Sequence, residues 1–226
     1  MKTVASLPKG VAIVVLGNFN PAIFHPLWFS HQELIRKGEG EGANLEVTHK
    51  EYSAFSTEWL RIEVDGEKFV AKTVSASHVE VLKDLVMGTF RLLRHTPVKA
   101  VGLNWDFQAK VADAERWHCV GDTLAPKAIW RKILPIPGMR SVEIESPRET
   151  PFPKGTTRVR IMPVDEGTSE WGITVHVHDH IDCSSTENGD SSERIGCSGF
   201  LELFPKAWDE SNKRANDIFK KLFEEL

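Results

Sequence analysis

Residues 101–111 read VGLNWDFQAKV, a stretch in which large apolar side chains alternate with polar or small ones. Successive side chains of a β-strand point to opposite faces of its sheet. The alternation therefore predicts a long strand with one buried face, which includes Trp105, and one face in solvent. A sheet that is solvated on one face is typically antiparallel.

Similar patterns continue on both sides of this strand. An apolar run at 11–16 predicts a buried strand, and Asp65-Gly66 predicts a hairpin turn between strands at 59–64 and 69–74. Alternation predicts further strands at 141–145, 157–162 and 172–181. The strands cluster instead of alternating with helices, so we expect an α+β fold with mainly antiparallel sheet and packed helices.

The helices of this fold are also predicted by pattern. Ser77 and Glu80 have the spacing of a capping box, which begins a helix. Apolar side chains recur at helical spacing from Pro205 onward, which predicts an amphipathic C-terminal helix containing Trp208. Other segments predict a helix at 24–35, a broken helix at 113–134, a glycine-rich flexible turn at 37–42, a short strand at 200–204 and a mobile polar loop at 184–195.

The sequence Pro135-Ile136-Pro137-Gly138 is the strongest internal boundary. It separates an N-terminal α+β lobe at 1–134 from a second lobe at 139–226, which holds the later strands and the terminal helix. A chain of 226 residues is long enough for one sizeable core. We therefore expect the two lobes to share one.

Composition excludes several classes of protein. Hydrophobic residues are 41% and charged residues 27% of the chain, as in ordinary globular proteins. A formal net charge of −4 argues against general nucleic-acid or anionic-membrane binding. Three cysteines without a Cys-x-x-Cys pair fit a reducing compartment, and the apolar run at 11–16 is too short to span a bilayer. We expect a cytoplasmic protein.

The chemically distinctive feature is the segment 174–180, which reads TVHVHDH. Residues two apart share a face of a strand, so His176, His178 and His180 project together while Asp179 points to the other face. Neighbouring side chains on that face lie roughly 7 Å apart, so His176 and His178 could chelate one metal ion. His176 and His180 lie about 13 Å apart, which is too far to share it.

Zinc is the natural candidate for such a pair, but catalytic zinc needs a third protein ligand. The sequence does not select one among Asp182, Cys183, His49 and His118. Two other interpretations are a solvated sheet face and a contact surface that becomes more positive as the pH falls toward 6. The solvated face is favoured over the zinc site.

The turn at 17–21, Gly-Asn-Phe-Asn-Pro, follows a strand and precedes a helix, which is the position of a phosphate-binding turn. It resembles the start of the nucleotidyltransferases that make dinucleotide cofactors. Their next motif, His-x-Gly-His, is absent, because His25 is followed by Pro-Leu-Trp. A strand exit closed by asparagine side chains explains the same residues and is favoured.

No complete catalytic constellation is present in the sequence, which favours a non-catalytic role. The small residues around Cys197 lack a nucleophile elbow, and the neighbours His118 and Cys119 point apart on a helix. Seven tryptophans are many for this length. Trp171 and Trp28, together with His180, are candidates for a contact surface.

The segments 14–26, 55–60, 85–90 and 95–98, with 124–127 and 137–141, resemble a family of uncharacterised bacterial proteins of about this length. The resemblance implies a bacterial cytoplasmic protein. It implies no activity, cofactor or site residues, because none is assigned to that family.

We therefore predict a binding or assembly module that acts through protein contacts, either with itself or with another protein. Edge strands and the apolar terminal helix offer such contacts. The alternative is a metal-dependent hydrolase that uses His176 and His178, and the weaker alternative is nucleotide binding at 17–21.

Overall fold

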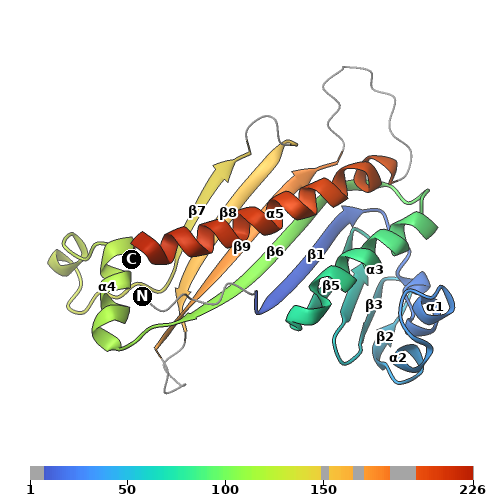
Figure 1. Cartoon of the computed structure of the whole chain (residues 1–226), viewed down its shortest axis with the longest axis horizontal. Helices are drawn as coiled ribbons and strands as arrows, with labels where there is room; N and C mark the ends of the chain where they lie inside the picture. The colour runs from blue at the N-terminus through green and yellow to red at the C-terminus, as the bar shows by residue number, and fades with distance from the viewer. Residues whose placement is uncertain (1–7, 149–152, 165–170, 184–196, 226) are drawn as a thin grey trace.

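The computed structural model describes residues 8–148, 153–164, 171–183 and 197–225. In this part of the chain the strands form one nine-stranded antiparallel sheet, ordered β2-β3-β4-β5-β1-β6-β9-β8-β7, with helices packed on it. This arrangement confirms the expected α+β class (Figure 1).

The strands are β1 (Gly10–Gly17), β2 (Asn44–Thr48), β3 (Tyr52–Ser56), β4 (Arg61–Asp65), β5 (Lys68–Thr73), β6 (Val98–Lys110), β7 (Val142–Pro147), β8 (Gly155–Pro163) and β9 (Gly172–Asp182). The helices are α1 (Pro26–His31), α2 (Lys37–Glu41), α3 (Val79–Leu92), α4 (Ala114–Leu124) and α5 (Ser198–Glu225), with short 3-10 turns at Pro21–Ile23, Ala76–His78 and Trp130–Lys132.

The chain passes twice through the same order of elements. Strand β1 is followed by short helices, a meander from β2 to β5, and α3; strand β6 is followed by α4, a meander from β7 to β9, and α5. In each half the first strand pairs antiparallel with the last strand of its meander. Strands β1 and β6 pair at the centre and join the two meanders. Strands β6 and β9 lie on either side of the expected boundary at 134–139 and pair along their length, so sheet and core are continuous across it.

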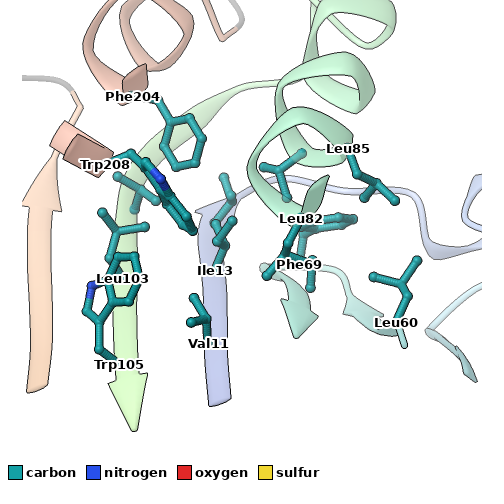
Figure 2. Packing of buried hydrophobic residues seen from close by; sticks show 14 of the residues in the cluster. Val11, Ile13, Leu60, Phe69, Leu82, Leu85, Leu103, Trp105, Phe204 and Trp208 are labelled. Carbon is teal, nitrogen blue, oxygen red and sulfur yellow. The ribbon is translucent and has the colours of Figure 1, made fainter. Parts of the chain in front are cut away.

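Helices α3 and α5 cover one face of the sheet (Figure 1). The strands supply alternating apolar side chains to this face, as the pattern at 101–111 predicts. The rings of Trp105 and Trp208 are fully buried, and their centroids lie 4.8 Å apart. Figure 2 shows the same layer, in which Val11, Ile13, Leu103 and Trp105 lie near Phe204, Trp208, Leu82 and Leu85.

The C-terminal helix begins earlier than the sequence predicts. Helix α5 includes 200–204, where a short strand was expected, and Pro205 lies inside the helix instead of at its start. Phe200, Phe204 and Trp208 are spaced four residues apart, and all three are buried against the core. Proline inside a helix removes one backbone hydrogen bond, and the burial of these aromatic rings offsets that loss.

Two further local predictions are wrong. The segment predicted as a flexible turn at 37–42 contains α2, because Glu39 accepts a hydrogen bond from the Arg36 amide (2.8 Å) and Gly40 packs closely on Ser30. Ser77 does not cap α3, because it lies inside a 3-10 turn and α3 begins at Val79 without a side-chain cap. The loop predicted at 184–195 lies outside the described residues.

Candidate functional site

The histidine row lies on the face of the sheet opposite α3 and α5, which we call the open face. Along β9, residues 174, 176, 178 and 180 are half-buried, whereas the residues between them are buried under α5. Two rows of directly opposed side chains cross β6, β9, β8 and β7 on the open face. One row is Asn104, His178, Arg158 and Glu145, and the other is Asp106, His176, Arg160 and Glu143.

Hydrogen bonds to β6 determine which ring nitrogen of each histidine carries a proton. Asn104 Nδ2 donates to the carbonyl of Ala12 (3.2 Å), so Asn104 Oδ1 faces His178 Nδ1 at 2.8 Å. Because an amide oxygen only accepts, His178 Nδ1 donates, and Nε2 of the neutral ring keeps its lone pair. His176 Nδ1 donates in the same way to the Asp106 carboxylate. Burial lowers the pKa of His178, and nearby His180 and Arg158 lower it further, which keeps the ring neutral at pH 7.

The ring of His178 leans toward His180. A β-carbon added to Gly102 would lie 3.0 Å from His178 Cε1, so this ring extends over Gly102. Gly102 is the register partner of His180. The ring centroids of His178 and His180 are 6.4 Å apart, and His180 Nε2 lies 3.4 Å from Asp182 Oδ1.

Arginine–glutamate pairs border the histidines on β8 and β7. Arg158 Nε donates to Glu145 Oε2 (3.0 Å), and Arg160 pairs with Glu143. A shallow hollow of about 310 Å³ lies among these groups; it is lined by Asn104, Asp106, Arg158, Arg160, His176, Val177 and His178. The hollow therefore presents ring nitrogens, a carboxylate and guanidinium groups together.

The fold itself does not require imidazoles at these positions. Strand β5 occupies in the first half the place that β9 occupies in the second, since each pairs with the first strand of its half. On the same face β5 carries Lys68, Val70 and Lys72. The histidine row is therefore a local property of β9.

Asp179 lies under α5 and is fully buried, on the face predicted from the strand alternation. Arg214 of α5 donates to its Oδ2 (2.8 Å), Arg148 Nη1 lies 3.3 Å from its Oδ1, and Thr157 also donates to it. The side chain of Arg148 is only 1% exposed. Sequence reasoning missed these partners, because none of them lies near Asp179 in the chain.

A second candidate site lies where α4 meets the ends of β8 and β9. A cleft of about 880 Å³ is lined by Trp117, His118, Val120, Gly121, Lys127, Ile136, Pro137, Gly138, Met139, Arg140, Ser141, Met162, Pro163, Val164 and Ile173. The adjoining segment 129–136, which we call the ridge, exposes five large apolar side chains: Ile129 (70%), Trp130 (50%), Ile133 (70%), Leu134 (47%) and Ile136 (93%). Ile136 belongs to both the ridge and the lining of the cleft, so the two adjoin.

The three residues predicted for a contact surface lie in separate places. Trp171 is 39% exposed and packs against Trp117 of α4, with ring centroids 5.3 Å apart. Trp28 is half-buried on α1 against Phe29. Helices α1 and α4 lie at opposite ends of the sheet, and β9, which carries His180, lies between them (Figure 1). Only Trp171 adjoins the cleft.

The turn at 17–21 uses its backbone amides internally. The N–H groups of Gly17, Asn18 and Phe19 donate to the carbonyls of Glu67, Pro97 and Gly66. Asn20 Oδ1 accepts from the Ala22 amide (3.2 Å). These amides are therefore engaged without a phosphate, and nucleotide binding here stays a prediction.

Of the proposed third metal ligands, Asp182 and Cys183 lie at the end of β9 beside the histidine row, and the other two lie far from it. His49 lies after β2, at the far edge of the sheet, and His118 packs beside Trp117 on α4. Burial raises the pKa of the Cys183 thiol to about 12, which disfavours the thiolate that a metal needs. Within the described residues, no group of three or more His, Cys, Asp and Glu side chains is placed to hold a metal ion. The metal-dependent hydrolase stays a prediction.

A search of known protein families found no family that matches the chain, and a search of curated proteins found no relative. Fold and sites therefore define the protein as an α+β protein in which α3 and α5 cover one face of an antiparallel sheet. The resemblance to the bacterial family stays a prediction. No helix in the described ranges is both long and apolar enough to cross a membrane.

Proposed function

We propose that this protein is a non-catalytic assembly module that associates with a second copy of itself through the ridge and the cleft. The observation that carries the proposal is the exposure of five large apolar side chains within 129–136. Large contiguous apolar surfaces are rare on monomeric soluble proteins and typically mark contact sites.

The arrangement of ridge and cleft supports a second copy as the partner. A two-fold symmetric interface needs a patch that is complementary to itself. Here Ile136 belongs to both the exposed apolar segment and the lining of the cleft, so the two adjoin. A two-fold axis between them would place each ridge in the cleft of the other copy and cover both at once.

The chemistry of the cleft also fits this occupant. Its lining includes Trp117, Val120, Met139 and Met162, which suit isoleucine and leucine side chains better than a polar ligand. The free cysteines Cys119, Cys183 and Cys197 support a reducing compartment such as the cytoplasm for this association.

Replacing Ile133 with aspartate is expected to weaken self-association at least tenfold. Burying an isoleucine side chain contributes about 1.5–3 kcal/mol, and a buried unpaired carboxylate adds a desolvation penalty. Sedimentation velocity over a range of concentrations measures the effect. Val74→Asp is the matched control, because Val74 is 83% exposed but lies outside the ridge.

Circular dichroism should show that both variants are folded. Equal association of Ile133→Asp, Val74→Asp and the unmodified chain would contradict the proposed interface. An unmodified chain that stays monomeric over the whole concentration range would contradict self-association altogether.

A further inference from the structure

We propose that His178 and His180 together bind one divalent transition-metal ion, such as Zn²⁺, on the open face of the sheet. The inference concerns a different surface from the ridge and cleft and does not depend on self-association. It also differs from the His176–His178 pair that strand spacing alone suggests, because the rings that approach each other are those of His178 and His180.

The first step of the argument is the free lone pair on His178. Asn104 cannot rotate its amide without losing the hydrogen bond from Nδ2 to the Ala12 carbonyl. Its oxygen therefore accepts a hydrogen bond from the Nδ1–H group of His178, which leaves Nε2 of this ring with a lone pair. An imidazole nitrogen with a lone pair is a strong ligand for zinc and similar ions.

The second step is the orientation of His180. The Asp182 carboxylate lies 3.4 Å from His180 Nε2, so it favours the proton on that nitrogen and leaves Nδ1 as the ligand atom. Metal-bound histidines commonly donate their other N–H to a carboxylate or carbonyl oxygen, which fixes the ring. Asn104 and Asp182 provide one such acceptor for each ring.

The third step is distance. Zinc–nitrogen bonds are about 2.0–2.1 Å, so two imidazoles on one tetrahedral ion have ring centres roughly 5 Å apart. The rings of His178 and His180 are 6.4 Å apart, and their planes differ by 31°. Small side-chain rotations close the difference. Gly102 makes room for this arrangement, since the ring of His178 lies over it.

The local charge is mixed, because Arg158 disfavours a cation at His178 whereas Asp182 favours one at His180. Arg158 is the cation opposite His178, and it is paired with Glu145. Asp182 adds a negative charge beside His180. Two protein ligands leave the remaining positions to water, so this is a site of modest affinity and not a complete catalytic zinc site.

Isothermal titration of the untagged full chain with ZnCl₂ tests the proposal. We expect saturable binding of one ion, and at least a tenfold weaker affinity for His178→Gln and for His180→Gln. His176→Gln is the matched control on the same strand and face, and it should bind within about twofold of the unmodified chain. Asn104→Leu should weaken binding by roughly 10–100-fold, as expected when an orienting partner is removed.

Imidazole ¹⁵N NMR spectra provide a readout that does not depend on affinity. His178 should be the Nδ1–H tautomer before zinc is added, and only the His178 and His180 nitrogens should shift on titration. The absence of saturable binding up to about 1 mM zinc, which corresponds to roughly 4 kcal/mol, would overturn the site. A loss of affinity in His176→Gln equal to that in His180→Gln would overturn the choice of pair.

Discussion

Replacing Asp179 with alanine is expected to lower the free energy of unfolding by about 3–5 kcal/mol, because it removes a fully buried carboxylate that faces buried arginine charge. Asp179 is fully buried between the sheet and α5, where Arg148 and Arg214 approach its two oxygens. Removing the carboxylate also removes the acceptor for the Thr157 hydroxyl. Urea denaturation followed by far-ultraviolet circular dichroism measures the change.

Glu145→Gln is the matched control for this substitution. It removes a carboxylate from another arginine pair, that of Arg158, whose two side chains are 43% and 48% exposed. Exposed ion pairs typically contribute no more than about 1 kcal/mol. If Asp179→Ala lowered the free energy of unfolding as little as Glu145→Gln, the buried pair of Asp179 and Arg214 would not contribute to holding α5 on the sheet.

Replacing Trp208 with alanine is expected to destabilise the protein by about 3–5 kcal/mol, as for other large aromatic side chains removed from a core. Trp208 is fully buried against Trp105, and its Nε1 donates to Glu80 of α3 (3.1 Å). It thereby joins α5 to both the sheet and α3. For a chain of this length the melting temperature should fall by roughly 10 °C, which differential scanning calorimetry can measure.

Trp208→Phe separates the two contributions of this side chain. It keeps an aromatic ring against Trp105 but loses the hydrogen bond to Glu80, so we expect a loss of about 1–2 kcal/mol. A loss below about 1 kcal/mol for Trp208→Ala would contradict the central position of Trp208 in the core.

Strands with strict alternation could be predicted from the sequence, because apolar and polar residues alternate within the strand itself. Strands β6 and β9 are the clearest cases, since their buried and solvated faces match the pattern. Strands β2 and β3 were not predicted. All of β2 is exposed. Ser53 of β3 is buried, and its hydroxyl is satisfied by donating to the Phe24 carbonyl, a contact that the local sequence does not indicate.

The surroundings of the histidine row could not be predicted in the same way. The shared face of His176, His178 and His180 follows from local spacing alone. The acceptors Asn104 and Asp106 lie about seventy residues earlier in the chain and reach the row only because β6 and β9 are neighbours in a specific register. Both residues are polar positions in the alternating segment 101–111. Which strand they face, and in what register, depends on the whole fold.

The apolar ridge was hidden from sequence reasoning for a different reason. Residues 113–134 read as a broken helix, and apolar side chains in such a segment suggest burial. In the structure α4 ends at Leu124, and the following residues leave Ile129 and Ile133 each 70% exposed. Exposure is a property of packing, so it can be recognised only once the neighbours of the segment are known.

A mixing experiment tests most directly whether the ridge of one copy lies in the cleft of the other. The variant Ile133→Asp damages the ridge and leaves the cleft intact. The variant Gly121→Phe fills the cleft from α4 and leaves the ridge intact, since a β-carbon at Gly121 would make only an ordinary 3.8 Å contact with Met139. In a two-fold dimer each homodimer of variants loses both ridge–cleft contacts, whereas a mixed dimer keeps one.

Sedimentation velocity of each variant alone and of their equimolar mixture is the decisive measurement. The account predicts that each variant alone sediments as a monomer and that the mixture recovers a dimer, weaker than that of the unmodified chain. A mixture that sediments as a monomer while the unmodified chain forms a dimer would contradict the seating of one copy's ridge in the other copy's cleft.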